Sequence, residues 1–293
     1  MKVYPNVKLN LGLRVIRRRP DGYHDIETLF VPYDGYSDGL EIERSGAFSI
    51  VIDGPHYHGW DAAGDLTARA WKLLSDELGI GPVAIHLTKN APVGAGLGGG
   101  SADAAFALRA LDALFGLGLG DAALAAYAAR LGSDCPFFVY NRPMLASGRG
   151  EVLEPFDIDL SGYRIEVSIP EGVAVSTREA YAGLDLGGYR EATASDPVRG
   201  SAAHPSQTCV WAPPSNTAEG GMPLGGSGLP ISDILHLPVS SWKDLLVNDF
   251  ERSVFPKHPE IAALKEGFYE RGAAYSAMSG SGSAVFALFP LNS

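Results

Sequence analysis

The stretch APVGAGLGGGSADAAFALRALDALFG, Ala91 to Gly116, joins a glycine-rich segment directly to a helical pattern. Five of the seven residues from 94 to 100 are glycine. Each glycine costs about 0.5–1 kcal/mol of backbone entropy relative to alanine in an ordered segment. We therefore expect something to approach the main chain closely at this point.

The helical pattern begins at Ser101, where apolar residues start to recur at intervals of three and four. A helix N-terminus carries unpaired N–H groups and about half a positive charge. Glycines without side chains let those N–H groups reach phosphate oxygens. The segment from Gly94 to Ser101 is therefore interpreted as an anion cradle, in preference to a plain strand-to-helix connection.

The common phosphate-binding motifs fit this segment poorly. GAGLGG, residues 94–99, matches G-x-G-x-x-G, but the region about 20 positions on, where that motif needs an acidic residue after a strand, still reads as helix. A Walker A loop requires lysine where Gly100 stands, and the protein-kinase motifs H-R-D and D-F-G do not occur. A cation that binds triphosphate must therefore come from elsewhere in the chain.

Composition narrows the class of protein. The chain has 293 residues, 46% of them hydrophobic, which predicts a globular protein of one large or two ordinary domains. Its net charge of −11 argues against nucleic-acid or anionic-membrane partners. No run approaches the roughly 18 apolar residues of a membrane span, and the first residues lack the apolar core of a signal peptide. Two cysteines, Cys135 and Cys209, form neither a disulfide framework nor a metal site. We expect a cytoplasmic protein, either a monomer or a homodimer.

Periodicity and turn residues predict a mixture of strands and helices. Strands are expected at 2–18 (one or two, around Pro5), 26–33, 40–44, 48–53, 83–89, 136–140, 163–170 and on both sides of the glycine-serine turn in 273–289. Helices are expected at 65–79, with Asp65 as N-cap and Gly79 as stop, and at 101–116, 121–132, 240–255 and 259–272. A polar shift near Asp157 predicts domains 1–157 and 158–293. A Gly/Pro/Ser-rich insertion or lid is expected at about 187–230.

The segment PVGAGLGGGSADAA, residues 92–105, resembles the P-x-x-x-G-L-G-S-S-A-A loop of the GHMP small-molecule kinases. Three further blocks resemble that family in the same order, namely VKLNLGLRVIRRRPDGYHDIETLF (7–30), LGSDCPFFV (131–139) and MSGSGSAVFALF (278–289). The resemblance covers nearly the whole chain. It implies an α+β, two-domain GHMP kinase fold, with a mixed-sheet N-terminal nucleotide-binding domain, a smaller α+β C-terminal domain and the site in the cleft between them.

The resemblance also implies that ATP is the co-substrate, with Mg²⁺ bridging its phosphates. The residues that it implies for triphosphate binding are Pro92, Gly94, Gly96, Leu97, Gly98, Gly99, Gly100 and Ser101. The second small hydroxyl residue that is common in this loop is replaced here by Ala102.

Lys8 and Asn10 are alternate residues of one predicted strand and so share a face. By resemblance, Lys8 is the cation near the transferring phosphoryl group, Asn10 binds the substrate, and Asp134 is the general base. A lysine beside this aspartate would favour its ionised form. From the residues alone, the favoured interpretation is an exposed lysine of an edge strand for Lys8 and a loop carboxylate for Asp134, and the resemblance reverses it.

Within the family, the blocks resemble the branch that phosphorylates the 2-hydroxyl of a cytidyl diphosphate ester of methylerythritol, in the non-mevalonate route to isoprenoid precursors. For this small-molecule substrate the resemblance implies that Tyr23 stacks on cytosine, that His24 contacts the base edge, and that Tyr181 forms the second side of the stack. A stacked aromatic contributes about 1–3 kcal/mol per base.

Other readings of these motifs stay open. DGYH can be a plain hairpin turn, SGSGS (279–283) a tight hairpin, and the arginine-rich segment 14–19 an exposed hairpin or an attractor of anionic substrate. Two rival functions follow from the family itself, namely a kinase that acts on a sugar or homoserine, and an inactive member that senses ligand. Intact Lys8 and Asp134 argue against the second rival.

Overall fold

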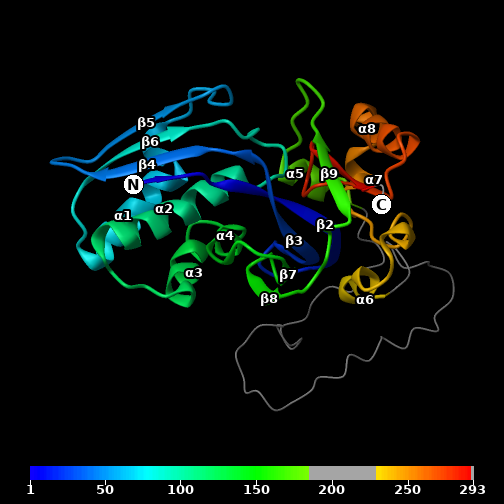
Figure 1. The fold of residues 1–293 in the computed structure, drawn as a ribbon, viewed down its shortest axis with the longest axis horizontal. Coiled ribbons are helices and arrows are strands. Elements are labelled where there is room, and N and C mark those ends of the chain that lie inside the picture. The colour runs from blue at the N-terminus through cyan, green and yellow to red at the C-terminus, as the bar shows by residue number, and fades with distance from the viewer. Residues whose placement is uncertain (185–228, 292–293) are drawn as a thin grey trace, which may run out of the picture.

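The computed structural model describes residues 1–184 and 229–291. The predicted insertion at about 187–230 therefore lies almost wholly outside the described residues, as does Cys209. In Figure 1 the first helices and their sheet form one half of the molecule, and β9, α6, α7 and α8 lie at the other end.

The first half is a mixed sheet covered on one side by helices. The strands run in the order β1 (Lys2–Val3), β4 (Gly39–Arg44), β6 (Val83–Thr88) and β5 (Ser49–Asp53). β5 is parallel to β6, whereas the other pairs are antiparallel. The helices α1 (Leu66–Leu78) and α2 (Gly99–Phe115) pack against each other below this sheet (Figure 1). The mixed sheet confirms that feature of the predicted fold class.

A second, antiparallel sheet carries part of the site. It has the order β2 (Asn6–Arg18), β3 (His24–Ser37), β7 (Met144–Ser147) and β8 (Val152–Pro155). The hairpin of β2 and β3 has its tip at residues 19–23, a turn that contains Pro20 and Gly22.

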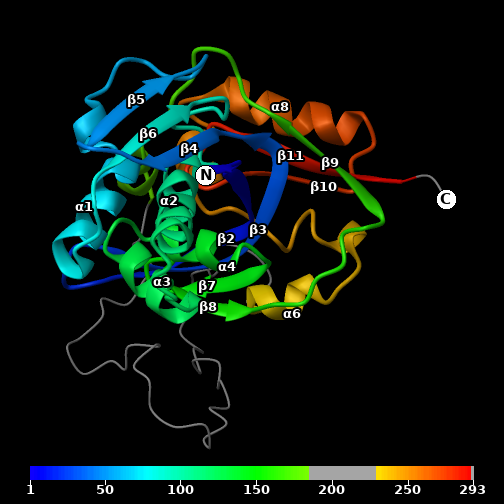
Figure 2. The same ribbon diagram turned by 60° about the vertical axis from the view of Figure 1, so that its left-hand side comes forward.

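The third sheet lies in the C-terminal part of the chain. Its order is β10 (Tyr275–Met278), β11 (Val285–Pro290) and β9 (Tyr163–Ser168), and α8 (Pro259–Glu270) lies beside β10 and β11 (Figure 2). Short helices α5 (Thr177–Ala182), α6 (Ile231–Leu235) and α7 (Glu251–Val254) complete this part. The domain boundary predicted near 157 falls in the connection from β8 to β9 and stays a prediction.

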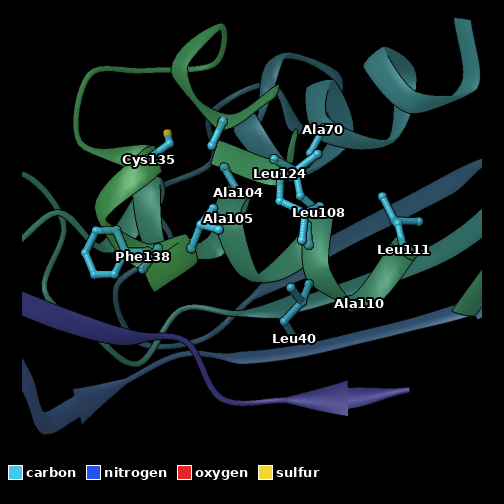
Figure 3. Close-up of a cluster of buried hydrophobic side chains, with 14 of the residues drawn as sticks. Leu40, Ala70, Ala104, Ala105, Leu108, Ala110, Leu111, Leu124, Cys135 and Phe138 are labelled. Atoms are coloured by element: carbon cyan, nitrogen blue, oxygen red, sulfur yellow. The ribbon is translucent and has the colours of Figure 1, made fainter. Parts of the chain in front are cut away.

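Small side chains let α2 pack closely against its neighbours. Ala104, Ala105, Leu108 and Leu111 are fully buried, and Figure 3 shows them in one apolar cluster with Leu40 of the sheet. α1 begins at an Asp65 N-cap and ends at Gly79 in the left-handed conformation, as its sequence predicted. The buried face of α2 fixes the direction in which its N-terminus points.

Two predicted elements are wrong. Residues 136–140 form the helix α4 (Cys135–Tyr140) instead of a buried strand. Almost every side chain of α4 is buried, so the segment has no hydrophobic period that would separate helix from strand, and Pro136 is compatible with a first helical turn.

The predicted helix at 240–255 is also wrong over most of its length. Only the 3₁₀ turn η2 (Val239–Ser241) and α7 at the end are helical. Between them the chain lies beside β2, where the Leu13 N–H donates to the Val247 carbonyl and the Asp249 N–H donates to the Leu13 carbonyl, both at about 2.9 Å or less. These bonds use the backbone groups that a helix would need.

Candidate active site

A cleft of about 1480 Å³ opens where β2, the tip of the β2–β3 hairpin, the glycine loop, the first turn of α2 and α5 meet. All of the site residues predicted from the sequence line it, namely Lys8, Asn10, Tyr23, His24, Pro92, Gly94, Gly96, Leu97, Gly98, Gly99, Gly100, Ser101, Asp134 and Tyr181. The structure therefore brings the predicted residues together, while their individual roles stay predictions.

Three glycines give the loop before α2 its shape. Gly94, Gly96 and Gly98 have φ values of +74°, +78° and +75°, which L side chains rarely adopt. Gly98 is the N-cap of α2, and a Cβ there would lie 3.2 Å from the Lys8 Cε atom. The backbone N–H groups that begin α2 thus face the cleft without side chains in front of them.

The glycine loop is locked to the turn formed by residues 279–283. The Ala284 N–H donates to the Ala95 carbonyl (3.0 Å), and the Ser279 hydroxyl donates to the Gly96 carbonyl (3.2 Å). A Cβ on Gly96 would lie closer than 3.0 Å to the Ser279 carbonyl oxygen. The SGSGS turn is therefore part of the site floor as well as a hairpin between β10 and β11.

Lys8 supplies the cation that the loop itself lacks. Its side chain is buried, and its ammonium group donates to the Asn10 amide oxygen and to the Gly96 carbonyl (3.3 Å). Nζ lies 3.7 Å from Asp134 Oδ2 and 4.8 Å from the centroid of the Phe30 ring. Burial lowers the pKa of Lys8, and the Asp134 carboxylate opposes that effect.

Asp134 lies directly before α4 and presents its carboxylate to the cleft. Its side chain is 34% exposed, whereas that of Lys8 is 4% exposed. The carboxylate is therefore accessible from the cleft, and the ammonium group pairs with it from the buried side. The neighbouring Cys135 is fully buried, and burial raises the pKa of its thiol to about 11. This thiol is unsuited to act as a nucleophile.

Asn10 is engaged inside the protein. Its amide oxygen accepts from Lys8, its amide nitrogen donates to the Thr28 hydroxyl (3.0 Å), and its backbone N–H donates to the Ser279 hydroxyl (3.3 Å). These contacts orient the lysine. The predicted contact between Asn10 and substrate remains a prediction.

Aromatic residues gather at one end of the cleft, around the tip of the β2–β3 hairpin and α5. The rings of His24 and Tyr181 are stacked, with centroids 4.3 Å apart and an angle of 13° between their planes. Tyr181 also packs edge-on against Phe250, and burial raises its pKa to about 12. Burial and then the charge of Arg18 lower the pKa of His24, so its imidazole is neutral at pH 7. Tyr23 is largely exposed at the rim.

A buried charge cluster beneath the glycine loop was missed in the sequence. The Lys89 ammonium pairs with Asp38 and with Asp103 of α2 (2.5 Å to Oδ2). Asp38 Oδ1 accepts the backbone N–H groups of Asn90 (2.6 Å) and Ala91 (2.7 Å), which fixes the start of the loop. Burial raises the pKa of Asp103 well above its usual range. The one signal in the sequence for this cluster is Asp103, a charged residue on the apolar face of α2.

Among the described residues, no group of three or more His, Cys, Asp or Glu side chains could hold a metal ion. In the same residues no helix is both long and apolar enough to cross a membrane.

Comparison with known proteins places this geometry in a family. The GHMP kinases N terminal domain matches residues 65–142, and the GHMP kinases C terminal domain matches residues 234–293. The 4-diphosphocytidyl-2-C-methyl-D-erythritol kinases of Bacteroides thetaiotaomicron and Parabacteroides distasonis are 40% and 42% identical to the chain. Each alignment covers 99% of this chain and 92% of the relative.

Solved structures agree with the sequence comparison. A crystal structure of 4-(cytidine 5'-diphospho)-2C-methyl-D-erythritol kinase is 30% identical, with a TM-score of 0.72 over 98% of this chain and 90% of that chain. Methanococcus jannaschii mevalonate kinase shares the fold, with a TM-score of 0.63 at 11% identity over 99% of this chain and 90% of that chain. On this evidence the chain belongs to the 4-diphosphocytidyl-2-C-methyl-D-erythritol kinase family of the GHMP kinases.

Proposed function

We propose that the chain transfers the γ-phosphoryl group of ATP to the 2-hydroxyl of 4-diphosphocytidyl-2-C-methyl-D-erythritol, in the cytoplasm, as a step of the non-mevalonate route to isoprenoid precursors. One observation carries this proposal. The Lys8 ammonium lies 3.3 Å from the Gly96 carbonyl of the glycine loop and 3.7 Å from the Asp134 carboxylate. A single cation therefore joins the phosphate-binding loop to the proposed base.

The geometry suits phosphoryl transfer. This reaction passes through a loose transition state, so that positioning and charge stabilisation dominate catalysis. Backbone N–H groups of the loop and of the first turn of α2 bind the triphosphate, and Lys8 stabilises charge on the phosphoryl group in transit. Asp134 accepts the proton of the substrate hydroxyl as the oxygen–phosphorus bond forms.

The donor set of the cleft fits a magnesium ion that is held mainly by nucleotide. Mg²⁺ commonly keeps several waters and takes one or two protein oxygens together with substrate phosphates. Ser101, in the first turn of α2 and on the wall of the cleft, would supply such an oxygen. When bound, Mg²⁺ neutralises phosphate charge.

The aromatic end of the cleft fits the cytidyl group. The neutral imidazole of His24 can donate and accept hydrogen bonds at the base edge, and Tyr23 and Tyr181 offer ring faces for stacking. His24 covers one face of the Tyr181 ring, so that a cytosine base would stack on the other face.

A coupled assay of ADP release with the cytidyl substrate tests the proposal. Asp134→Asn should lower kcat by about 10²–10⁴-fold, because general-base catalysis contributes that much. The affinity for ATP should change little, since Asp134 is proposed to act on the other substrate. Asp76→Asn, an exposed carboxylate on α1, is the matched control. Wild-type ADP release no faster than that of Asp134→Asn would refute the proposal.

CMP separates this function from that of other GHMP kinases. If the aromatic end binds cytosine, CMP competes with the cytidyl substrate but leaves the KM for ATP unchanged. Phosphorylation of homoserine or a sugar, without inhibition by CMP, would point to a different substrate.

A further inference from the structure

Asn248 is a buried polar residue that the proposed mechanism does not use. It is 2% exposed and does not line the cleft. Its amide nitrogen donates to the Met278 carbonyl (2.7 Å) and to the Gly280 carbonyl (2.8 Å), at the turn formed by residues 279–283. Its amide oxygen accepts the Phe250 N–H (3.0 Å), so the whole amide group is engaged with backbone.

The two carbonyls that Asn248 binds belong to the residues on either side of Ser279. Ser279 is fully buried, and its hydroxyl oxygen lies 3.2 Å from the Gly96 carbonyl oxygen and 3.5 Å from Asn10 Oδ1. These are the same two oxygens that accept the Lys8 ammonium group. Asn248 therefore holds, from both sides, a hydroxyl that contacts both acceptors of Lys8.

Gly280 packs against the same two oxygens. Its φ is +55°, and a Cβ there would lie 2.9 Å from the Gly96 carbonyl oxygen and 3.5 Å from Asn10 Oδ1. A shift of the Gly280 carbonyl away from Asn248 would therefore move backbone that is in close contact with the acceptors of the lysine. In a close-packed interior such a shift is passed on to the neighbouring atoms.

The segment that carries Asn248 is fixed to β2. The Leu13 N–H donates to the Val247 carbonyl (2.9 Å), and the Asp249 N–H donates to the Leu13 carbonyl (2.8 Å). The Asp249 carboxylate also accepts the Val15 N–H (2.8 Å). Because β2 carries the buried lysine as well, this strand sets the position of the ammonium group directly and that of the turn through Asn248.

We propose that Asn248 is a positioning residue for phosphoryl transfer. It lies outside the cleft, and through the turn at 279–283 it fixes the two oxygens that orient the Lys8 ammonium group. The inference rests on the proposed function and deepens it, because it makes the orientation of the cation depend on a residue that no substrate reaches. A residue with a merely structural role would lower stability without a specific effect on the chemical step.

A double-mutant cycle between Asn248 and Ser279 tests this route in the ADP-release assay, at saturating ATP and cytidyl substrate. Asn248→Ala should lower kcat about 10²-fold, the effect of displacing a catalytic group by about 1 Å. Ser279→Ala should lower kcat about tenfold, the loss of one hydrogen bond beside the lysine. If both act through one contact, the double variant should be within about threefold of Asn248→Ala, whereas independent effects would multiply to about 10³-fold.

The split between kcat and KM identifies the step that Asn248 supports. Asn248→Ala should leave the KM for the cytidyl substrate within about twofold, because Lys8 is proposed to act on the phosphoryl group in transit. A raised KM with an unchanged kcat would instead place the role of Asn248 at Phe250, whose ring packs against Tyr181 with 4.7 Å between centroids, and would overturn the inference.

Asp249→Ala is the matched control. Asp249 is the next residue, is 3% exposed, and its carboxylate binds a backbone group of β2, the Val15 N–H, instead of the turn. Both variants lose a buried hydrogen bond between side chain and backbone, so both should lower the midpoint of urea unfolding. Asp249→Ala should keep kcat within about twofold of wild type, because its hydrogen bond does not reach the acceptors of the lysine. An equal fall of kcat in both variants would reveal a structural role alone.

Asn248→Asp covers the case in which Asn248→Ala does not fold. It keeps the size of the side chain and the oxygen that accepts the Phe250 N–H, and it puts at most one donor where the amide has two. Asn248→Asp should lower kcat at least about tenfold, and it then takes the place of Asn248→Ala in the cycle.

The outcomes separate the inference from the proposed function. If wild type releases ADP with the cytidyl substrate and the effects of Asn248→Ala and Ser279→Ala multiply, the inference alone is refuted. An unchanged kcat in Asn248→Ala would do the same. If wild type released no ADP, the proposed function would fall, and the inference with it.

Discussion

Replacing Gly96 by alanine tests how much the close packing of the glycine loop against the turn at 279–283 contributes to stability and activity. Gly94 provides a matched control, because its φ of +74° is close to the +78° of Gly96 and no atom of residues 1–184 or 229–291 lies within 4 Å of a Cβ on Gly94. A Cβ on Gly96 would collide with the Ser279 carbonyl and approach the Gly282 backbone. The two substitutions share the cost of a left-handed alanine and differ in the collision.

The magnitudes follow from these two contributions. A left-handed conformation costs an L-residue about 1–2 kcal/mol, so Gly94→Ala should lower the free energy of unfolding by about that much. Overpacking adds about 1–3 kcal/mol where backbone must move, so Gly96→Ala should lose about 2–5 kcal/mol in total. Urea unfolding at equilibrium measures both values.

Gly96→Ala should also affect catalysis, because the Gly96 carbonyl accepts a hydrogen bond from Lys8. A displacement of about 1 Å in a catalytic group can cost about 10²-fold in rate. Gly96→Ala should therefore lower kcat at saturating ATP far more than Gly94→Ala does. Equal stability and equal activity of the two variants would show that a side chain at Gly96 does not collide with Ser279, and would contradict the prediction.

Three further predictions concern the cluster beneath the loop and the aromatic end of the cleft. Asp38→Asn should cost about 3–5 kcal/mol in urea unfolding, because it breaks a buried ion pair; the exposed Asp53→Asn should cost less than about 1 kcal/mol. Because burial and Arg18 hold the pKa of His24 below its usual 6.5, the imidazole is half protonated only at a pH below that value. The KM for the cytidyl substrate should change little from pH 8 to 7.5 and rise as the pH falls through the lowered pKa, and Arg18→Gln should move the midpoint of that rise upward. Tyr181→Ala should raise this KM by the equivalent of about 1–3 kcal/mol while Tyr181→Phe retains most of the affinity, and a KM for ATP that rose equally would contradict a stacking role.

Local sequence signals identified those parts of the fold that local chemistry determines. The caps of α1 at Asp65 and Gly79 confirm a prediction that needed only neighbouring residues. The helix α4 was missed because a segment that is buried on all sides has no period to read. The extended segment around Asn248 was missed because its hydrogen bonds go to β2, more than two hundred positions away in the chain.

In the site, too, residues within local motifs could be predicted, whereas residues that only the fold brings together could not. Lys8 and Asp134 could be named from motifs, and the structure places them 3.7 Å apart. The pairing of Lys89 with Asp38 and Asp103 could not be named, because three isolated charges in separate elements carry no spacing that links them. The contact of Arg149 with Tyr23 could not be named either, because only the fold brings the β7–β8 loop to the tip of the β2–β3 hairpin.

The glycine density of the loop has two separate causes. Among the described residues nothing lies within 4 Å of a Cβ on Gly94, so its φ of +74° and the proposed approach of phosphate are the reasons for glycine there, and packing is not. Gly96 and Gly98 are required by the protein itself, because a Cβ on either would press on the Ser279 backbone or on the Lys8 side chain. The entropy that these glycines cost, about 0.5–1 kcal/mol each, is therefore offset by internal packing at Gly96 and Gly98, and on the proposed function by nucleotide binding at Gly94. The close approach that the sequence predicted is made within the protein, by the turn at 279–283 against Gly96 and by the buried Lys8 against Gly98.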